Sequence, residues 1–242
     1  MKRMSDLSWP EGVATVTAED RQALGEALAD QVAQWLREAL GASGEPRVSL
    51  ALSGGSTPVP FFQALARKPL SWDRVCVLLV DERWVPEEHA ASNARLVREH
   101  LLQGAASEAT FLSMVTEDAT PEEGQSQVEK RLSGLRLPLD VVVLGMGNDG
   151  HTASLFPGTP GLAEALDPAG TERCRAMTPP GAEHARMTLT RPVIAGAQHR
   201  VLHIAGEEKL DTLAKALAQP DDERAMPIRA FLRSGLTVYW SA

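Results

Sequence analysis

Short apolar runs that alternate with amphipathic segments constrain the fold of this chain more than any other feature. The apolar runs occupy residues 48–52, 75–80, 140–144, 201–205 and 236–240. Apolar residues recur three or four positions apart over residues 18–40, 61–66, 93–102, 125–135 and 207–218, which predicts helices there. Uninterrupted apolar strands suit a sheet that is covered on both faces. The sequence therefore predicts an α/β fold, with a doubly wound, mostly parallel sheet and helices on both faces.

The composition is that of one globular domain. A length of 242 residues fits a single large α/β domain, no region has the composition of a linker, and no internal repeat is evident. Hydrophobic residues make up 43% of the chain, which is enough to bury a substantial core. We therefore expect one domain over residues 1–242.

Charge and cysteine content argue against several classes of partner. A net charge of −8 does not suit a general nucleic-acid or anionic-membrane surface, because either needs clustered Lys and Arg. Residues 1–6 lack the apolar core of a signal peptide, and no stretch approaches the roughly 20 apolar residues of a membrane span. Cys76 and Cys174 have neither disulfide nor metal-site spacing. We expect a cytoplasmic protein with no metal, no cofactor and no nucleic-acid or membrane partner.

The first candidate site is a glycine loop directly after an apolar run, at the strand end where open α/β sheets bind ligands. Its paired glycines, Gly54 and Gly55, let the backbone approach a ligand. Ser56 and Thr57 supply hydroxyls near a predicted helix start, where backbone N–H groups and the helix dipole favour an anion. The alternative is a turn with a helix cap, in which Pro58 is the first helical residue. The loop lacks the Lys of a P-loop and the full spacing of a dinucleotide fingerprint.

The second candidate site is the charged segment Asp81-Glu82-Arg83, which follows the apolar run 75–80. A strand that ends in three charges should present them to the ligand crevice. We therefore assign Asp81 and Arg83 to the active site, with Arg83 beside the sugar or a developing oxyanion and Asp81 orienting its neighbours. A surface ion pair between Glu82 and Arg83 is the alternative.

The third and richest candidate site is the glycine-rich turn that follows the run 140–144. The turn places Asp149 two residues before His151, so that a carboxylate and an imidazole share one environment. An imidazole has an ordinary pKa of about 6.5, so near neutral pH it is both deprotonated and basic enough to accept a proton. We predict that His151 is a general base and that Asp149 orients its ring or stabilises the imidazolium.

Together these segments resemble the 6-phosphogluconolactonases. The matching motifs are Ser-Gly-Gly-Ser-Thr-Pro at 53–58, Asp-Glu-Arg-Trp-Val-Pro at 81–86 and Gly-Asn-Asp-Gly-His-Thr-Ala-Ser-Leu-Phe-Pro at 147–157. The resemblance extends to Arg-Met-Thr-Leu-Thr at 186–190 and Ile-Ala-Gly-Glu-Glu-Lys at 204–209, so it covers the chain from the first helix onward. It implies the fold of glucosamine-6-phosphate deaminases and ribose-5-phosphate isomerases, in agreement with the strand and helix pattern.

The resemblance implies a reaction and further site residues. The expected reaction is hydrolysis of 6-phospho-D-glucono-1,5-lactone to 6-phospho-D-gluconate in the oxidative pentose phosphate pathway, with His151 activating the water that attacks C1. Family basic residues fall at Arg186 and Lys209, which would supply the counter-charge for the phosphate. Ser53 and Asn148 complete the predicted substrate contacts. A lactone carbonyl can be attacked without a Lewis acid, so no metal is required.

Two other functions compete with lactone hydrolysis. An isomerising deaminase resembles this chain in the same three segments, but that family has a Glu for acid–base work at the position before the proline, where this chain has Phe156. A phenyl group cannot transfer a proton. A sugar-phosphate sensor without catalysis would keep the anion loop and would not need His151 beside Asp149. The sequence therefore favours the lactonase.

Overall fold

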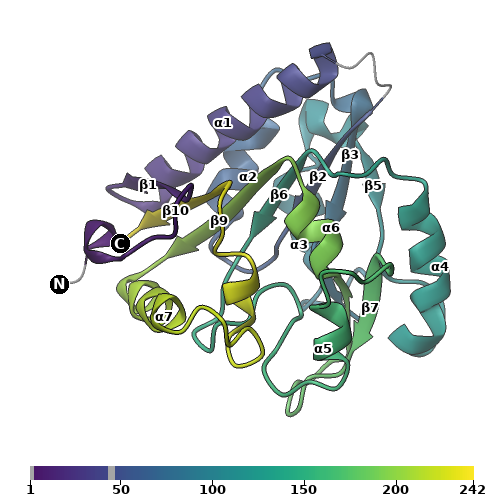
Figure 1. Cartoon of the computed structure of the whole chain (residues 1–242). Coiled ribbons are helices and arrows are strands. Elements are labelled where there is room, and N and C mark those ends of the chain that lie inside the picture. Colours follow the sequence, from purple (N-terminus) through teal and green to yellow (C-terminus); the bar gives the residue numbers. More distant parts are fainter. Residues whose placement is uncertain (1–2, 43–46) are drawn as a thin grey trace.

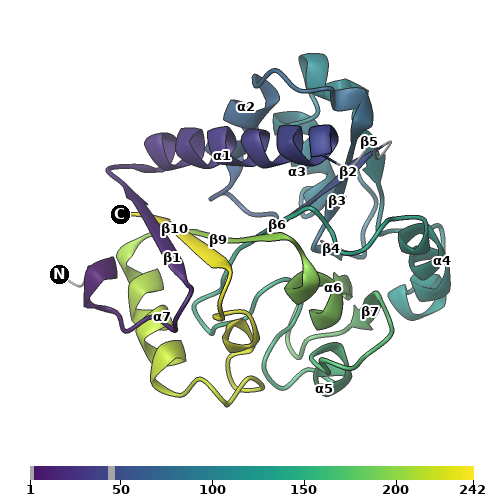
Figure 2. The ribbon, with the colours of Figure 1, turned by 45° about the horizontal axis from the view of Figure 1, so that its top comes forward.

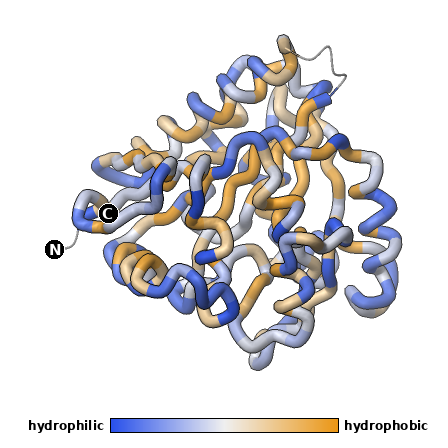
Figure 3. The backbone as a smooth tube through the Cα atoms, in the orientation of Figure 1, coloured by the Kyte–Doolittle hydropathy of each residue, from blue (hydrophilic) through white to orange (hydrophobic). Residues whose placement is uncertain are grey.

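A parallel sheet forms the centre of the computed structural model, which describes residues 3–42 and 47–242. Seven strands lie in the order β1-β10-β9-β6-β2-β3-β5, and every neighbouring pair is parallel (Figure 1). The strands are β1 Ala14–Ala18, β2 Val48–Leu52, β3 Val75–Leu79, β5 Thr110–Leu112, β6 Val141–Leu144, β9 His199–Ala205 and β10 Leu236–Ser241. Figure 3 shows the hydrophobic central strands within a largely polar exterior. The predicted doubly wound, mostly parallel sheet is confirmed.

Helices cover both faces of this sheet. They are α1 Arg21–Ala42, α2 Val59–Ala66, α3 Asn93–His100, α4 Pro121–Ser133, α5 Leu162–Ala165, α6 Arg191–Gly196 and α7 Glu207–Ala218. Short 3-10 helices occupy Met4–Asp6, Trp72–Arg74, Gly104–Glu108 and Pro227–Ala230. Figure 2 shows α1 and α2 on one side of the sheet and α6 and α7 on the other. None of the helices in the described ranges is long and apolar enough to cross a membrane.

A second, three-stranded antiparallel sheet was not predicted. It consists of β4 (Asp81–Arg83), β8 (Arg186–Leu189) and β7 (Cys174–Met177), in that order. Its register sets Asp81 opposite Thr188 and Arg83 opposite Arg186. The charged segment that follows β3 is thus itself a strand. This small sheet brings Arg186 beside Asp81 and Arg83, although more than a hundred positions separate them in the sequence.

The first two helices begin at other residues than the sequence predicts. The first helix begins at Arg21 instead of residue 18, because the Asp20 carboxylate accepts a hydrogen bond from the Ala23 amide at 2.8 Å and caps the helix. Residues 14–18 form the edge strand β1, whose largely exposed side chains give no apolar run. Helix α2 begins at Val59, two residues before the predicted start at 61. Pro58 is its N-cap, whereas the alternative interpretation of the glycine loop made it the first helical residue.

Glu82 forms no surface ion pair with Arg83, because its side chain is turned inward. Its residue exposure is 1%, and its carboxylate accepts hydrogen bonds from the Asn93 amide at 2.8 Å and the Ala94 amide at 2.7 Å. The Ser92 hydroxyl donates a further hydrogen bond to it at 3.1 Å. These donors form the start of α3, so Glu82 fastens that helix to the end of β4.

Candidate active site

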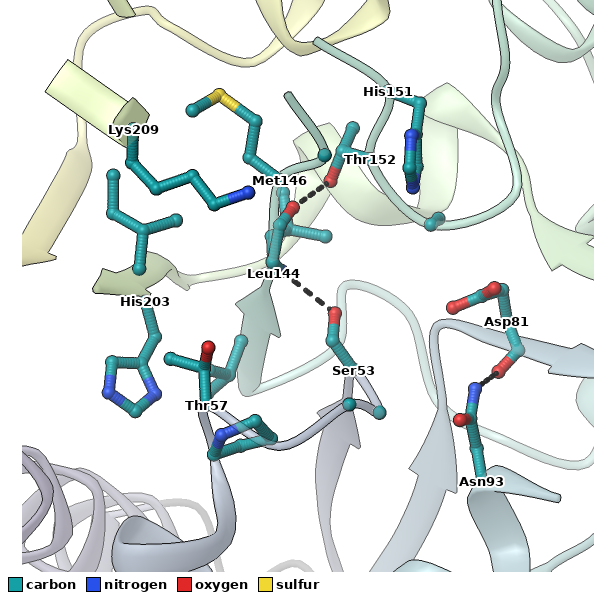
Figure 4. Close-up of a pocket in the computed structure, with 18 of the residues that line it drawn as sticks. Ser53, Thr57, Asp81, Asn93, Leu144, Met146, His151, Thr152, His203 and Lys209 are labelled. Atoms are coloured by element: carbon teal, nitrogen blue, oxygen red, sulfur yellow. Dashed lines mark hydrogen bonds between the residues drawn. The ribbon is translucent and has the colours of Figure 1, made fainter. Parts of the chain in front are cut away.

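The candidate site lies where the winding direction of the sheet reverses, between β2 and β6. At such a switch point the loops after the two strands diverge and leave a crevice for ligands. Ser53 joins the two loops: its amide donates to the Val143 carbonyl at 3.0 Å, and its hydroxyl accepts from the Gly145 amide at 2.9 Å. A pocket of about 240 Å³ opens at this point (Figure 4).

Most of the predicted site residues line this pocket, and three do not. Those that line it are Ser53, Gly54, Gly55, Thr57, Asp81, Arg83, His151, Arg186 and Lys209. Ser56, Asn148 and Asp149 lie outside the lining set. Asn93, Thr152 and His203 also line the pocket and were not predicted as site residues.

The glycine loop owes its path to two positions that only glycine suits. A side chain at Gly54 would overlap the amide group of Asn93. Gly55 has φ +92°, a backbone conformation that L side chains rarely adopt. The loop then enters α2, and Gly54, Gly55 and Thr57 line the pocket. This wall can therefore offer N–H and O–H donors to an anion.

Asp81 forms the charged wall with two arginines. Its residue exposure is 6%, and its Oδ2 accepts a hydrogen bond from the Ser154 hydroxyl at 2.6 Å. The Arg186 Nη1 lies 3.9 Å from the same oxygen. Burial lowers the pKa of Arg186, and the attraction of Asp81 opposes this shift. The guanidinium of Arg83, the second arginine of this wall, is held in place because its Nη1 donates to the Ala91 carbonyl at 2.7 Å.

His151 and Asp149 are in direct contact. The His151 Nδ1 and the Asp149 Oδ1 are 2.6 Å apart, and the same oxygen accepts from the His151 amide at 3.0 Å. Burial alone would raise the pKa of Asp149, but these hydrogen bonds and the charge of His151 outweigh it and lower the pKa below its ordinary value. Because Nδ1 is occupied, Nε2 is the ring nitrogen that remains for acid–base work. Gly147 makes room for this arrangement, since a side chain there would overlap the imidazole.

Lys209 reaches the pocket from the first turn of α7. Its Nζ lies 2.5 Å from the Asn148 Oδ1, and the Thr212 hydroxyl donates to the Asn148 carbonyl at 3.3 Å. In Figure 4 the Lys209 side chain extends toward the loop that carries Met146. Asn148 therefore holds the Lys209 ammonium group by a hydrogen bond and does not itself line the pocket. No group of three or more His, Cys, Asp or Glu in the described ranges could hold a metal ion.

His203 is a second imidazole in the pocket wall. It lies in β9 with a residue exposure of 4%, and its ring meets Phe61 edge-on at a centroid distance of 6.0 Å. Its Nδ1 has no hydrogen-bond partner among the described residues. Burial lowers the pKa of His203 to about 4. The only sequence signal for this residue was one polar position within the apolar run 201–205.

The burial of His203 predicts a loss of stability in acid. Between pH 6.5, the ordinary pKa of an imidazole, and pH 4, His203 is protonated in the unfolded chain but stays neutral in the folded chain. The free energy of unfolding should therefore fall by roughly 3 kcal/mol more over this window in the wild type than in His203→Leu. Urea denaturation of both proteins at a series of pH values measures the difference. A difference that stayed constant from pH 6.5 to pH 4 would contradict the prediction.

Comparison with known proteins finds relatives along almost the whole chain. The family model for glucosamine-6-phosphate isomerases/6-phosphogluconolactonase matches residues 19–240. The 6-phosphogluconolactonase of Pseudomonas aeruginosa is 49% identical, over 98% of this chain and 98% of that protein. That of Rhizobium meliloti is 48% identical, over 92% and 96%. The crystal structure of a 6-phosphogluconolactonase from Shewanella baltica has a TM-score of 0.91 at 42% identity, and the match covers 97% of this chain and 100% of that one.

Proposed function

Because the chain belongs to the glucosamine-6-phosphate isomerase/6-phosphogluconolactonase family, we propose that it hydrolyses 6-phospho-D-glucono-1,5-lactone to 6-phospho-D-gluconate. The observation that carries this proposal is the pair of His151 and Asp149 at a sugar-sized pocket, in a chain whose relatives at 48–49% identity are named 6-phosphogluconolactonase. Residues 1–242 would then form one domain with one active site, which acts in the oxidative pentose phosphate pathway.

In the proposed reaction His151 is the general base. Its Nε2 takes a proton from a water molecule while the water oxygen attacks C1 of the lactone, and the carbonyl becomes a tetrahedral oxyanion. The bond between C1 and the ring oxygen then breaks, and the imidazolium returns its proton to the departing ring oxygen. Asp149, held at 2.6 Å from Nδ1, orients the ring and stabilises its charged form. Arg83 stabilises the oxyanion. Asp81 holds Arg186 in place.

The phosphate end of the substrate needs donors and positive charge. The backbone of the glycine loop and the hydroxyls of Ser53 and Thr57 supply the donors. Arg186 and Lys209, which line the same pocket from two different walls, supply the charge. Ser56 and Asn148 do not border the pocket, so direct contact with the phosphate would require them to move.

The deaminase alternative needs a carboxylic acid where this chain has Phe156. That ring lies stacked on the proposed base, at a centroid distance of 3.9 Å, and it offers no proton. The direct test is to supply freshly generated 6-phosphogluconolactone to the purified protein and follow acid release above the spontaneous rate. Glucosamine 6-phosphate is the comparison substrate. Ammonia release without lactone hydrolysis would overturn the proposal.

Removal of either proposed phosphate cation should mainly raise KM. A hydrogen bond to a charged group contributes about 1.5–3 kcal/mol, so Lys209→Ala and Arg186→Ala should each raise KM by roughly 10-fold or more. The Lys209 variant is the cleaner of the two, because Arg186 also faces Asp81. Lys215→Ala, on the same helix α7 and away from the pocket lining, is the matched control. Unchanged KM in both active-site variants would show that neither Lys209 nor Arg186 binds the phosphate.

A further inference from the structure

The ring of Phe156 contacts both the proposed base and one of the proposed phosphate cations. The Phe156 and His151 rings are stacked, with centroids 3.9 Å apart and planes at 22°. The Arg186 Cζ lies over the same phenyl ring, 5.0 Å from its centroid. His151 follows β6 of the large sheet and Arg186 begins β8 of the small one. Phe156 thus contacts two functional groups, one in the loop after the large sheet and one in the small sheet.

A tight turn brings Phe156 back onto His151. The Leu155 amide donates to the Thr152 carbonyl at 3.0 Å, and the Thr152 hydroxyl donates to the Gly145 carbonyl at 2.7 Å. Ala153, inside this turn, has φ +50°, a left-handed conformation that costs energy for any residue with a side chain. Leu155 is fully buried. Buried contacts thus hold a strained turn in place, and this turn sets the position of the phenyl ring.

A stacked phenyl ring does two things that an aliphatic side chain cannot. Its flat face fixes the plane of the imidazole, which otherwise could rotate about its side-chain bonds while keeping contact with Asp149. Its electron-rich face also attracts a cation held against it. During the reaction His151 becomes a cation, and Arg186 is one throughout. An apolar residue without a π face would shield both groups from water and attract neither.

We propose that Phe156 is a positioning residue of the lactonase reaction, whose ring holds the His151 imidazole in its working orientation, stabilises its protonated form and fixes the Arg186 guanidinium. This inference rests on the proposed function and deepens it. Phe156 itself transfers no proton and forms no bond to substrate. The position that separates this chain from the deaminases thus takes part in the chemistry by holding the base.

The test compares Phe156→Leu with Phe156→Tyr. Leucine keeps an apolar cover and removes the π face, so kcat should fall by about 10-fold as the base loses its alignment. The midpoint of the acid limb of the pH profile of kcat/KM should move to lower pH by about half a unit, because the protonated base loses its attraction to the ring. Phe156→Tyr should restore both values to near those of the wild type. Phe111→Leu is the matched control: Arg98 lies 4.9 Å over that ring, and Phe111 does not line the pocket.

A second readout does not depend on activity. Carbon-bound protons of the His151 ring lie in the shielding region of the stacked phenyl, so their NMR signals should lie upfield in the wild type and in Phe156→Tyr. They should move downfield in Phe156→Leu. A folded Phe156→Leu protein with at least half the wild-type kcat, an unmoved acid limb or unmoved His151 signals would overturn the inference, as would a Tyr variant as impaired as the Leu variant. Absence of lactonase activity in the wild type would instead overturn the proposed function.

Discussion

Replacement of His151 by Ala should lower kcat by about 10²–10⁴-fold, the usual contribution of a general base. The Nδ1 of this imidazole is held by Asp149 and its ring lines the pocket, so its Nε2 is left to take the proton of the attacking water. Binding of the product 6-phosphogluconate should persist, because the glycine loop and the two cations remain. Stopped-flow measurement of acid release, with spontaneous lactone hydrolysis subtracted, gives kcat, and calorimetric titration gives product affinity.

His100→Ala is the matched control for this substitution. His100 ends α3 and lies outside the pocket lining, with its ring near the Gln63 amide at 3.5 Å, so kcat should not change. If a folded His151→Ala protein kept more than about a third of the wild-type kcat, against the 10²-fold minimum expected for a base, His151 would not be the base. A loss of product binding equal to the loss of kcat would indicate a role in binding instead.

The central sheet could be predicted because its strands are buried on both faces. Every residue of β2 and β3 is buried, so β3 appears in the sequence as an unbroken apolar run and β2 as one that is apolar apart from Ser49. Strand β1 has mostly exposed side chains, and its place at the sheet edge depends on pairing with β10, more than two hundred residues away. The small sheet could not be predicted from local sequence either, because its strand β4 consists of three charged residues and has no apolar pattern.

The site could be predicted as far as it depends on local sequence. His151 and Asp149 are two residues apart, and Gly147 between β6 and the histidine removes the side chain that would block the ring. The partners of Asp81 could not be found in this way, since Ser154 and Arg186 reach it only through the folded chain. Asn93 was visible as the opening residue of a helix, but its role as the neighbour that excludes a side chain at Gly54 is a matter of tertiary packing.

Replacement of Glu82 by Ala should cost about 3 kcal/mol or more of unfolding free energy. The carboxylate accepts from three backbone amides, those of Arg83, Asn93 and Ala94, and each buried donor left without a partner costs about 1–3 kcal/mol. Burial raises the pKa of Glu82 because the charged group loses its water, although the three amides oppose the shift. The amides of Asn93 and Ala94 at the start of α3 donate to the carboxylate, and these hydrogen bonds offset the cost of burying it. Chemical denaturation of the variant and the wild type measures the loss.

The same substitution should reach the active site through Asn93. Its amide group donates to the Asp81 carbonyl at 3.0 Å, and its own backbone amide is held by Glu82, so loosening the start of α3 releases the charged wall of the pocket. Activity of the folded fraction should therefore fall together with stability, whereas Glu99→Ala on the exposed face of α3 should change stability by no more than about 0.5 kcal/mol. Glu82→Gln retains one acceptor oxygen but turns an amide NH₂ toward backbone donors, and it should lie between the Ala variant and the wild type. Equal stability of the Glu82→Ala protein and the wild type would show that water can replace the carboxylate at this helix start, and that α3 is held to the sheet by its apolar contacts alone.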